Sequence, residues 1–360
     1  MKKSDLLHTT VDHYDIKAVN VVPIIDMMEK TAFQARNLAR AAKIVDEMIA
    51  DKECGIILTL AGSLISAGQK EIILDMMRSN MVDAIVSTGA NIVDQDFFEA
   101  LGFRHYQGTP FCSNDDLHDL HIDRIYDTYI DEDELRVCDE TMHKIAESLD
   151  PRPYSSREFV LEMGKYLNTH IPEAESVVLE AYRRNIPIFV PAFSDCSAGF
   201  GLVFHQVARQ QEGRPYLSID SVADFRELTQ LKIESGVTGL IMLGGGVPKN
   251  FVQDTVVSAE YLGYQVEMHK YAVQLTVADE RDGALSGSTL KEAHTWGKVE
   301  LEKEQMVYGE ATITFPLIAG YAYHKGSWHG RKARNFSEIF SEPATLKAKG
   351  YTEAKAAARS

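Results

Sequence analysis

Short apolar runs recur along this chain, and several are followed by a stretch of helical spacing. The runs occupy residues 55–58, 84–86, 186–190, 239–243 and 271–273. Helical spacing follows at 71–80 and 250–261. Alternation of this kind is typical of a parallel sheet wrapped by helices. We therefore expect an α/β fold with a doubly wound, mostly parallel sheet, in which Pro187 is acceptable only at the start of a strand.

The strand signal fades between about residues 100 and 185. Helical patterns cover 131–149 and 155–169, and Ser155 with Glu158 forms a possible capping box at the start of the second. We interpret this part as a helical insertion. Because no Ser-, Gly- or Pro-rich linker separates it, we predict one elaborated domain over 1–345 and a loose tail over 346–360.

Composition excludes several classes of partner. The 360 residues are 45% hydrophobic, which suffices for a sizeable core, and 37 Lys and Arg against 53 Asp and Glu leave a net charge of −16. Such a surface repels nucleic acid and anionic lipid and suits a cationic small molecule. Four dispersed cysteines, no apolar stretch behind Met1 and no run of about 20 apolar residues predict a cytoplasmic protein without signal peptide or membrane span.

Glycine-rich loops follow three of the apolar runs. They occupy 60–68, 87–91 with Asp94 beyond it, and 244–250. Ligands of open parallel sheets bind beyond the carboxyl ends of the strands, where small residues let backbone N–H groups approach a phosphate. None of the three loops is the G-x-G-x-x-G fingerprint, so each alone is weak support for a dinucleotide site, and their joint occurrence is stronger.

A fourth loop contains Asp282 and Gly283 and leads to Trp296 and Lys298. A lysine beside an aromatic ring in a partly dry pocket is disfavoured as a cation, and a neutral amine is the nucleophile that forms an imine. The alternative is a solvated lysine at a strand start with Trp296 as a core anchor. For a lone lysine, that alternative is the more common case.

Five motifs together resemble the deoxyhypusine synthases and their bacterial and archaeal relatives. Their order and spacing match from about residue 20 to about residue 320. The motifs are Trp296-Gly297-Lys298, Asp282-Gly283 with Ser286-Gly287, 244–247, 63–66 and 191–195.

The resemblance implies NAD-dependent transfer of a 4-aminobutyl group. NAD accepts hydride from spermidine, 1,3-diaminopropane leaves, and the butyl imine is carried on the enzyme lysine, which would be Lys298. The acceptor amine is a lysine of translation initiation factor 5A or, in relatives, putrescine, which gives homospermidine. The resemblance also implies a homotetramer with active sites at dimer interfaces.

The residues implied at the site form two groups. Those that would contact NAD are Gly62, Ser63, Ser66, Thr88, Gly89, Asp94, Asp195, Gly245 and Glu310. Those that would contact the polyamine are Glu292, Trp296, Asp282, Gly283, Ser286 and Asn250. Asp195 has the clearest role among them, because a carboxylate accepts hydrogen bonds from ribose hydroxyls.

The chain departs from the family where the amine should bind. Deoxyhypusine synthases have aspartates at the positions of Phe200 and Leu285, a Glu-Glu pair at Val93 and Asp94, and a histidine at Asn250. A buried cation needs a carboxylate partner. We therefore hypothesise that the amine substrates differ, and the base that deprotonates the amine is unassigned.

Other signals are weak. We expect no metal, because the acidic loop around His118 and His121 has no standard zinc spacing, and Cys196 beside Asp195 is a poor nucleophile. Two further readings stay open. One is an NAD-dependent amine dehydrogenase that does not need Lys298, and the other is a non-catalytic NAD- or polyamine-binding protein.

Overall fold

Six parallel strands form the central sheet of the computed structural model, which describes residues 2–340 and 346–348. The strands are β1 (Gly55–Leu60), β2 (Ala84–Ser87), β7 (Ile188–Phe189), β9 (Thr238–Leu243), β10 (His269–Thr276) and β11 (Val299–Tyr308). They lie in the order β11-β10-β9-β1-β2-β7, and every neighbouring pair is parallel. The predicted doubly wound sheet is confirmed. Of the predicted tail at 346–360, all but 346–348 lies outside the described residues.

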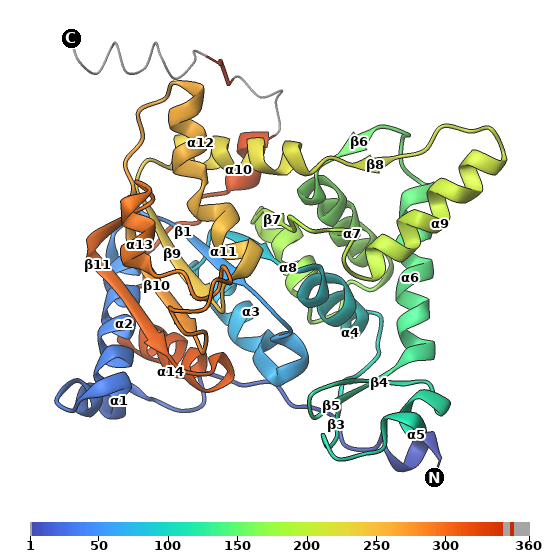
Figure 1. Cartoon of the computed structure of the whole chain (residues 1–360), viewed down its shortest axis with the longest axis horizontal. Helices are drawn as coiled ribbons and strands as arrows, with labels where there is room; N and C mark the ends of the chain where they lie inside the picture. The colour runs from blue at the N-terminus through green and yellow to red at the C-terminus, as the bar shows by residue number, and fades with distance from the viewer. Residues whose placement is uncertain (1, 341–345, 349–360) are drawn as a thin grey trace.

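The direction of winding reverses between β1 and β9. From β1 the chain builds outward through β2 to β7, and from β9 it builds the other way through β10 to β11 (Figure 1). This is the strand order of dinucleotide-binding folds, in which the ligand lies at the reversal, beyond the carboxyl ends of the strands. The loops after β1 and β9 therefore flank the expected binding crevice.

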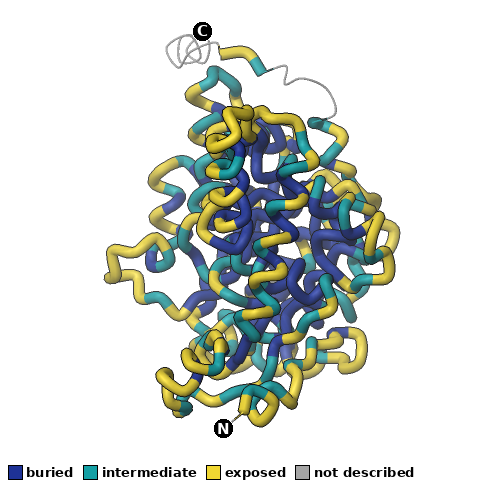
Figure 2. The backbone as a smooth tube through the Cα atoms, turned by 90° about the vertical axis from the view of Figure 1, so that its right-hand side faces the viewer, coloured by how far each residue is buried: buried dark blue, intermediate teal, exposed yellow. Residues whose placement is uncertain are grey.

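Along each strand, alternate side chains belong to two separate hydrophobic cores. On β1, Ile56, Leu58 and Leu60 belong to the larger core, whereas Ile57 belongs to the smaller one. The alternation follows from the two-residue repeat of a strand and shows that both faces of the sheet are covered. Figure 2 shows the buried backbone gathered in the interior. Among the described residues, no helix combines the length and apolarity needed to span a membrane.

Helices cover both faces. The chain has α1 (Val22–Glu29), α2 (Phe33–Ala50), α3 (Lys70–Arg78), α4 (Phe98–Ala100), α5 (Asn114–Asp119), α6 (Glu132–Glu147), α7 (Ser156–His170), α8 (Val177–Arg184), α9 (Ser197–Gln211), α10 (Ser221–Ser235), α11 (Gly246–Gln253), α12 (Thr255–Leu262), α13 (Leu290–Thr295) and α14 (Ala311–Lys325). Helices α2, α3 and α14 contribute to the larger core, and α10, α11 and α13 to the smaller.

The region from 100 to 185 contains the predicted helices but is not purely helical. The capping box is present, since the Ser155 hydroxyl accepts from the Glu158 N–H and the Glu158 carboxylate accepts from the Ser155 N–H. The region also contains short strands, which the fading strand signal did not indicate. Short strands β3 (Tyr106–Gln107), β4 (Ile122–Ile125) and β5 (Thr128–Asp131) pair antiparallel, and β6 (Pro153–Tyr154) pairs with β8 (Ser218–Ile219). Segments of two to four residues are too short to show a two-residue repeat.

A buried ion pair joins the segment after α14 to the start of the sheet. Arg331 donates to both carboxylate oxygens of Asp83, at 3.0 and 2.6 Å, and to the Cys54 carbonyl at 2.7 Å. Asp83 also accepts from the Ile56 N–H at 2.8 Å. Because the pair is almost fully buried, each charge depends on the other for compensation.

Removing one partner of this pair should strongly destabilise the fold. We expect Asp83→Ala to lower the free energy of unfolding by about 3–5 kcal/mol in urea denaturation, because it leaves a buried arginine unpaired. The double variant Asp83→Leu with Arg331→Met should recover much of that loss. Arg281→Met, which breaks an exposed pair with Asp279, serves as the control and should change little. An equal loss in the single and double variants would contradict this account.

Candidate functional site

The residues predicted to bind the cofactor lie along the carboxyl edge of the sheet. Gly62 and Ser63 follow β1, Thr88 and Gly89 follow β2, and Gly245 follows β9. Asp195 follows β7, and Glu310 follows β11 as the N-cap of α14. Parallel strands end at one edge, so the fold gathers residues that are far apart in the chain.

Asn91 fixes the loop after β1. Its Oδ1 accepts from the Leu64 N–H at 2.7 Å, and its Nδ2 donates to the Gly62 carbonyl at 3.0 Å. Gln95 accepts from the Ser66 N–H at 2.8 Å. The expectation that the amides of this loop face a phosphate is therefore wrong for Leu64 and Ser66, whose N–H groups are already used. The sequence did not indicate these positions for Asn91 and Gln95.

The glycines of these loops differ in the space that a side chain would have at each position. Gly62 and Gly246 have φ of +61° and +62°, and a Cβ on either would meet no atom within 4 Å. Their backbone therefore faces open space at the reversal of the sheet. By contrast, a Cβ on Gly89 would lie 2.5 Å from Cys196 Sγ, and one on Gly245 would lie 2.5 Å from Ser286 Cα. These two glycines are needed for packing between loops.

A cleft of about 640 Å³ opens beside the loop after β1. Ser63 and Ser66 line it together with Glu310 and Thr312 from the start of α14. Tyr126 and Asp127, between β4 and β5, close another side. The structure thus brings three of the predicted cofactor residues to one cleft, with hydroxyl and carboxylate groups suited to a polar ligand.

Asp94 supports the helix that carries Phe200. Its carboxylate accepts from the Ser197 N–H at 2.8 Å, at the start of α9. Burial raises the pKa of Asp94 to about 6, and the nearby Asp139 and Asp195 act in the same direction. Burial also raises the pKa of the Cys196 thiol to about 12, so this cysteine is not a thiolate at neutral pH.

Lys298 lies just before β11, at the amino edge of the sheet. Its backbone is held by the His269 N–H, which donates to the Lys298 carbonyl at 2.9 Å. The residue is only 9% exposed, so the solvated lysine of the alternative reading is wrong, although the position at a strand start is correct. The Nζ atom lies 2.5 Å from Asp254 Oδ1, 3.4 Å from Asn250 Oδ1 and 5.4 Å from the centre of the Trp296 ring.

The loop after β10 begins at the carboxyl ends of the strands and leads along the chain toward Lys298. Ser286 packs against Gly245, and the Nζ atom of Lys249 donates to the Leu285 carbonyl at 3.4 Å and to the Ser288 carbonyl. The loop is thereby held on α11, the helix that carries Asn250. Burial lowers the pKa of Lys249 to about 8.

Several predicted substrate residues face solvent. Asp282, Gly283 and Glu292 are exposed, and Trp296 is 65% exposed, so it is not a core anchor. Near Lys298 the structure therefore combines a buried amine with an open and partly acidic rim.

The structure does not bring Phe200 to Lys298. Phe200 lies on α9 after β7, and Lys298 precedes β11, so the two residues are at opposite edges of the sheet (Figure 1). The outermost strands β7 and β11 are five strand spacings apart, which is roughly 24 Å. Phe200 is 59% exposed and lies with Val203, Phe204 and Val207 on one exposed apolar face of α9.

Comparisons with known proteins agree with one another. Residues 23–322 match the family model of deoxyhypusine synthase. A "Deoxyhypusine synthase-like protein" of Chlorobaculum parvum is 64% identical over 94% of this chain and 96% of its own length. One of Coxiella burnetii is 58% identical over 94% and 96%, and "Probable deoxyhypusine synthase 2" of Methanosarcina mazei is 40% identical over 90% and 92%. A crystal structure of an Entamoeba histolytica protein described as a deoxyhypusine synthase covers 91% of this chain and 99% of its own, with a TM-score of 0.56. At 18% identity, that likeness concerns the fold.

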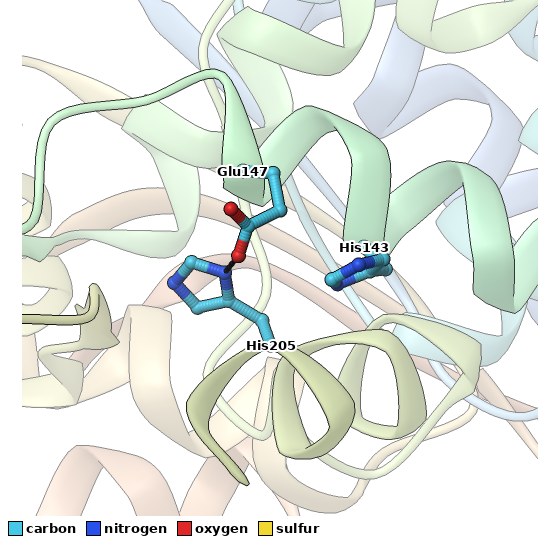
Figure 3. A group of neighbouring side chains, drawn as sticks. All are labelled: His143, Glu147 and His205. Carbon is cyan, nitrogen blue, oxygen red and sulfur yellow. Dashed lines mark hydrogen bonds and ion pairs between the residues drawn. The ribbon is translucent and has the colours of Figure 1, made fainter. Parts of the chain in front are cut away.

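A separate group of side chains joins α6 to α9. His143 and Glu147 lie on α6 and His205 on α9, and their ligand-type atoms lie within 4.8 Å of one another (Figure 3). His205 Nε2 accepts from the Leu217 N–H at 3.2 Å, so its proton is on Nδ1, which donates to Glu147 at 2.6 Å. Arg209 also donates to both Glu147 oxygens, from Nε to Oε1 at 2.9 Å and from Nη2 to Oε2 at 2.8 Å. A cation would have to displace a proton and approach a guanidinium, so these contacts favour a hydrogen-bonded anchor over a metal centre.

This anchor predicts a pH-dependent contribution to stability. Hydrogen bonds from Arg209, with one from His205, lower the pKa of Glu147 to about 2. Because the pKa of Glu147 is lower in the folded protein than in the unfolded chain, its carboxylate stabilises the fold at pH values above about 4.5. This stabilisation is lost as the pH falls toward 2. We expect Glu147→Gln to lower Tm at neutral pH and the difference from the native protein to narrow below about pH 4.5. Thermal unfolding across pH tests this. Glu140→Gln, at an exposed position on the same helix, serves as the control, and a difference independent of pH would contradict the prediction.

Proposed function

The chain belongs to the deoxyhypusine synthase family, a family of transferases, and from this membership we propose that it is a cytoplasmic, NAD-dependent aminobutyl transferase. It would move a 4-aminobutyl group from a spermidine-like polyamine, through an imine on Lys298, to an acceptor amine. The acceptor would be a protein lysine, as on an initiation factor 5A-like partner, or a small diamine such as putrescine. The observation that carries the proposal is the buried Lys298 amine held between Asp254, Asn250 and the Trp296 ring.

Lys298 has the surroundings that covalent catalysis by a lysine requires. Its side chain is almost fully buried, which restricts water around an imine that would otherwise hydrolyse. The Trp296 ring stabilises a positive charge on the nitrogen, whether ammonium or iminium. Imine formation divides one difficult amine exchange into easier steps.

The loops at the reversal of the sheet would hold NAD. Gly62 offers open backbone, Ser63 and Ser66 offer hydroxyls, and Asp195 offers a carboxylate for ribose hydroxyls. When bound, NAD supplies the hydride chemistry that no side chain provides. Thr88 and Asn91 keep the loop after β1 in place for this role, because both donate to the Gly62 carbonyl at 3.0 Å.

A second copy of the chain would complete the substrate site. Phe200 lies on the helix that follows β7, and Lys298 precedes β11, the outermost strand on the other side of the sheet, so we expect Phe200 to approach a substrate on Lys298 from another subunit. The exposed apolar face of α9 also needs a cover, since monomers rarely expose such contiguous patches. Both features support the homotetramer that the family resemblance implies.

Loss of Lys298 should abolish transfer. We expect the native enzyme, incubated with NAD, spermidine and putrescine, to release 1,3-diaminopropane and form homospermidine, and Lys298→Ala to form neither. Mass spectrometry of the small amines measures both. Oxidised amine without transfer, surviving in Lys298→Ala, would favour an amine dehydrogenase. Absence of turnover in both proteins would favour a non-catalytic binding protein.

Two apolar substitutions should determine which amines are accepted. We expect Phe200→Asp with Leu285→Asp to raise relative kcat/KM for amines with more separated positive charges, because each carboxylate compensates one ammonium. Val19→Asp with Val222→Asp, at exposed positions outside α9, adds the same two charges as a control. Unchanged relative kcat/KM across a series of amines would contradict the hypothesis.

A further inference from the structure

The amine of Lys298 has a carboxylate neighbour that no sequence motif indicated. Asp254 Oδ1 lies 2.5 Å from Lys298 Nζ, within hydrogen-bonding distance. We propose that Asp254 is the acid–base partner of Lys298, which takes a proton from Nζ as this atom attacks the donor imine and returns it to the departing amine. The inference rests on the proposed function, because it assigns a residue to the transfer step.

The backbone places Asp254 one helical turn after Asn250. Asp254 lies where α11 ends and α12 begins, and its N–H donates to the Asn250 carbonyl at 2.9 Å, as in a continuing helix. Residues four apart share one helix face. Both side chains therefore face Lys298.

Asn250 orients the carboxylate. Its Nδ2 donates to Asp254 Oδ2 at 2.8 Å, which leaves Oδ1 directed at Lys298. A nucleophile, a base within hydrogen-bonding distance and a third group that orients the base form the arrangement that activates catalytic nucleophiles in general. Asn250 is then a positioning residue, and Asp254 contacts the reacting nitrogen.

The other buried lysine nearby lacks this arrangement. Lys249 Nζ donates to the Ser288 and Leu285 carbonyls, so it is occupied in holding the loop after β10. Carbonyl oxygens cannot accept its proton, whereas a carboxylate can. The geometry therefore distinguishes a structural lysine from one prepared for proton transfer.

The transfer step balances with Asp254 as the shuttle. Lys298 begins as an ammonium, and Asp254 takes one proton as Nζ bonds to the carbon of the protonated donor imine. The carbon then breaks its bond to the donor nitrogen, which leaves as an ammonium because it gains the shuttled proton and the second Nζ proton, and Asp254 is again a carboxylate. The new iminium on Lys298 keeps one proton. Its positive charge replaces that of the ammonium beside the same carboxylate, and no oxidant or reductant is consumed in this step.

The ion pair can be tested without any substrate. Formaldehyde with cyanoborohydride methylates only neutral amines, and peptide mass spectrometry reports labelling at each lysine. We expect Asp254→Asn to speed labelling of Lys298 at neutral pH by about tenfold, because the ammonium loses its counter-ion. The exposed Lys291 on α13 serves as the internal reference and should be unaffected. Unchanged labelling of Lys298 would overturn the proposal.

Turnover should change in the opposite direction. We expect Asp254→Asn to lower kcat for aminobutyl transfer by about 100-fold to 1,000-fold, because the group that shuttles the proton is missing. This loss should occur even though Lys298 no longer has its counter-ion. Asp254→Glu keeps the carboxylate and should restore part of the rate. Glu260→Gln, exposed on α12, removes the same charge and should leave kcat unchanged. A purely structural role would not combine faster labelling with slower turnover.

The outcomes separate this inference from the proposed function. Native-like turnover in a folded Asp254→Asn enzyme would overturn the acid–base role and leave the transferase proposal intact. Absence of transfer by the native enzyme, with faster labelling in Asp254→Asn, would overturn the proposed function and its acid–base step. The ion pair itself would then still be supported.

Discussion

All six central strands run parallel, and this single constraint determines where the predicted cofactor residues gather. Parallel strands place their carboxyl ends at one edge, and each return to the amino edge needs a crossover that covers a face of the sheet. Because the winding reverses between β1 and β9, the loops containing Gly62 and Gly246 lie on the two sides of the expected crevice. The buried Arg331–Asp83 pair acts at the opposite end, where it joins the chain after α14 to the starts of β1 and β2.

The strand pattern could be read from the sequence where the strands are long enough to alternate or are fully buried. Strand β1 and strand β9 coincide with apolar runs, and the capping box marked the start of α7. The small sheets could not be predicted, because strands such as Tyr106–Gln107 have no period to detect and form only through pairing with distant segments. Pro187 directly precedes β7, as its missing N–H requires.

Motifs located the candidate site, but its contacts came from tertiary structure. Gly62, Ser63 and Lys298 belong to motifs, whereas Asn91, Gln95 and Asp254 have no signal of their own. The roles of these three depend on which loops and helices meet. Asn91 acts on the loop after β1 across 27 residues, and Asp254 meets Lys298 because the end of α11 lies beside the residue that precedes β11. A single sequence does not contain such distances.

Lys249 and Lys298, two of the buried lysines, show how burial and partners separate similar side chains. Burial alone lowers the pKa of a lysine, as it does for Lys249, to about 8. If desolvation decided reactivity, Lys249 would be the better nucleophile. Its nitrogen is held by backbone carbonyls, however, and its attack would release the loop over Gly245. Lys298 pairs with a carboxylate that can accept a proton and remain beside the charge that replaces the ammonium. In the proposed transfer, which exchanges one nitrogen cation for another, a fixed anion at 2.5 Å would serve both states, so the electrostatic environment would need little reorganisation.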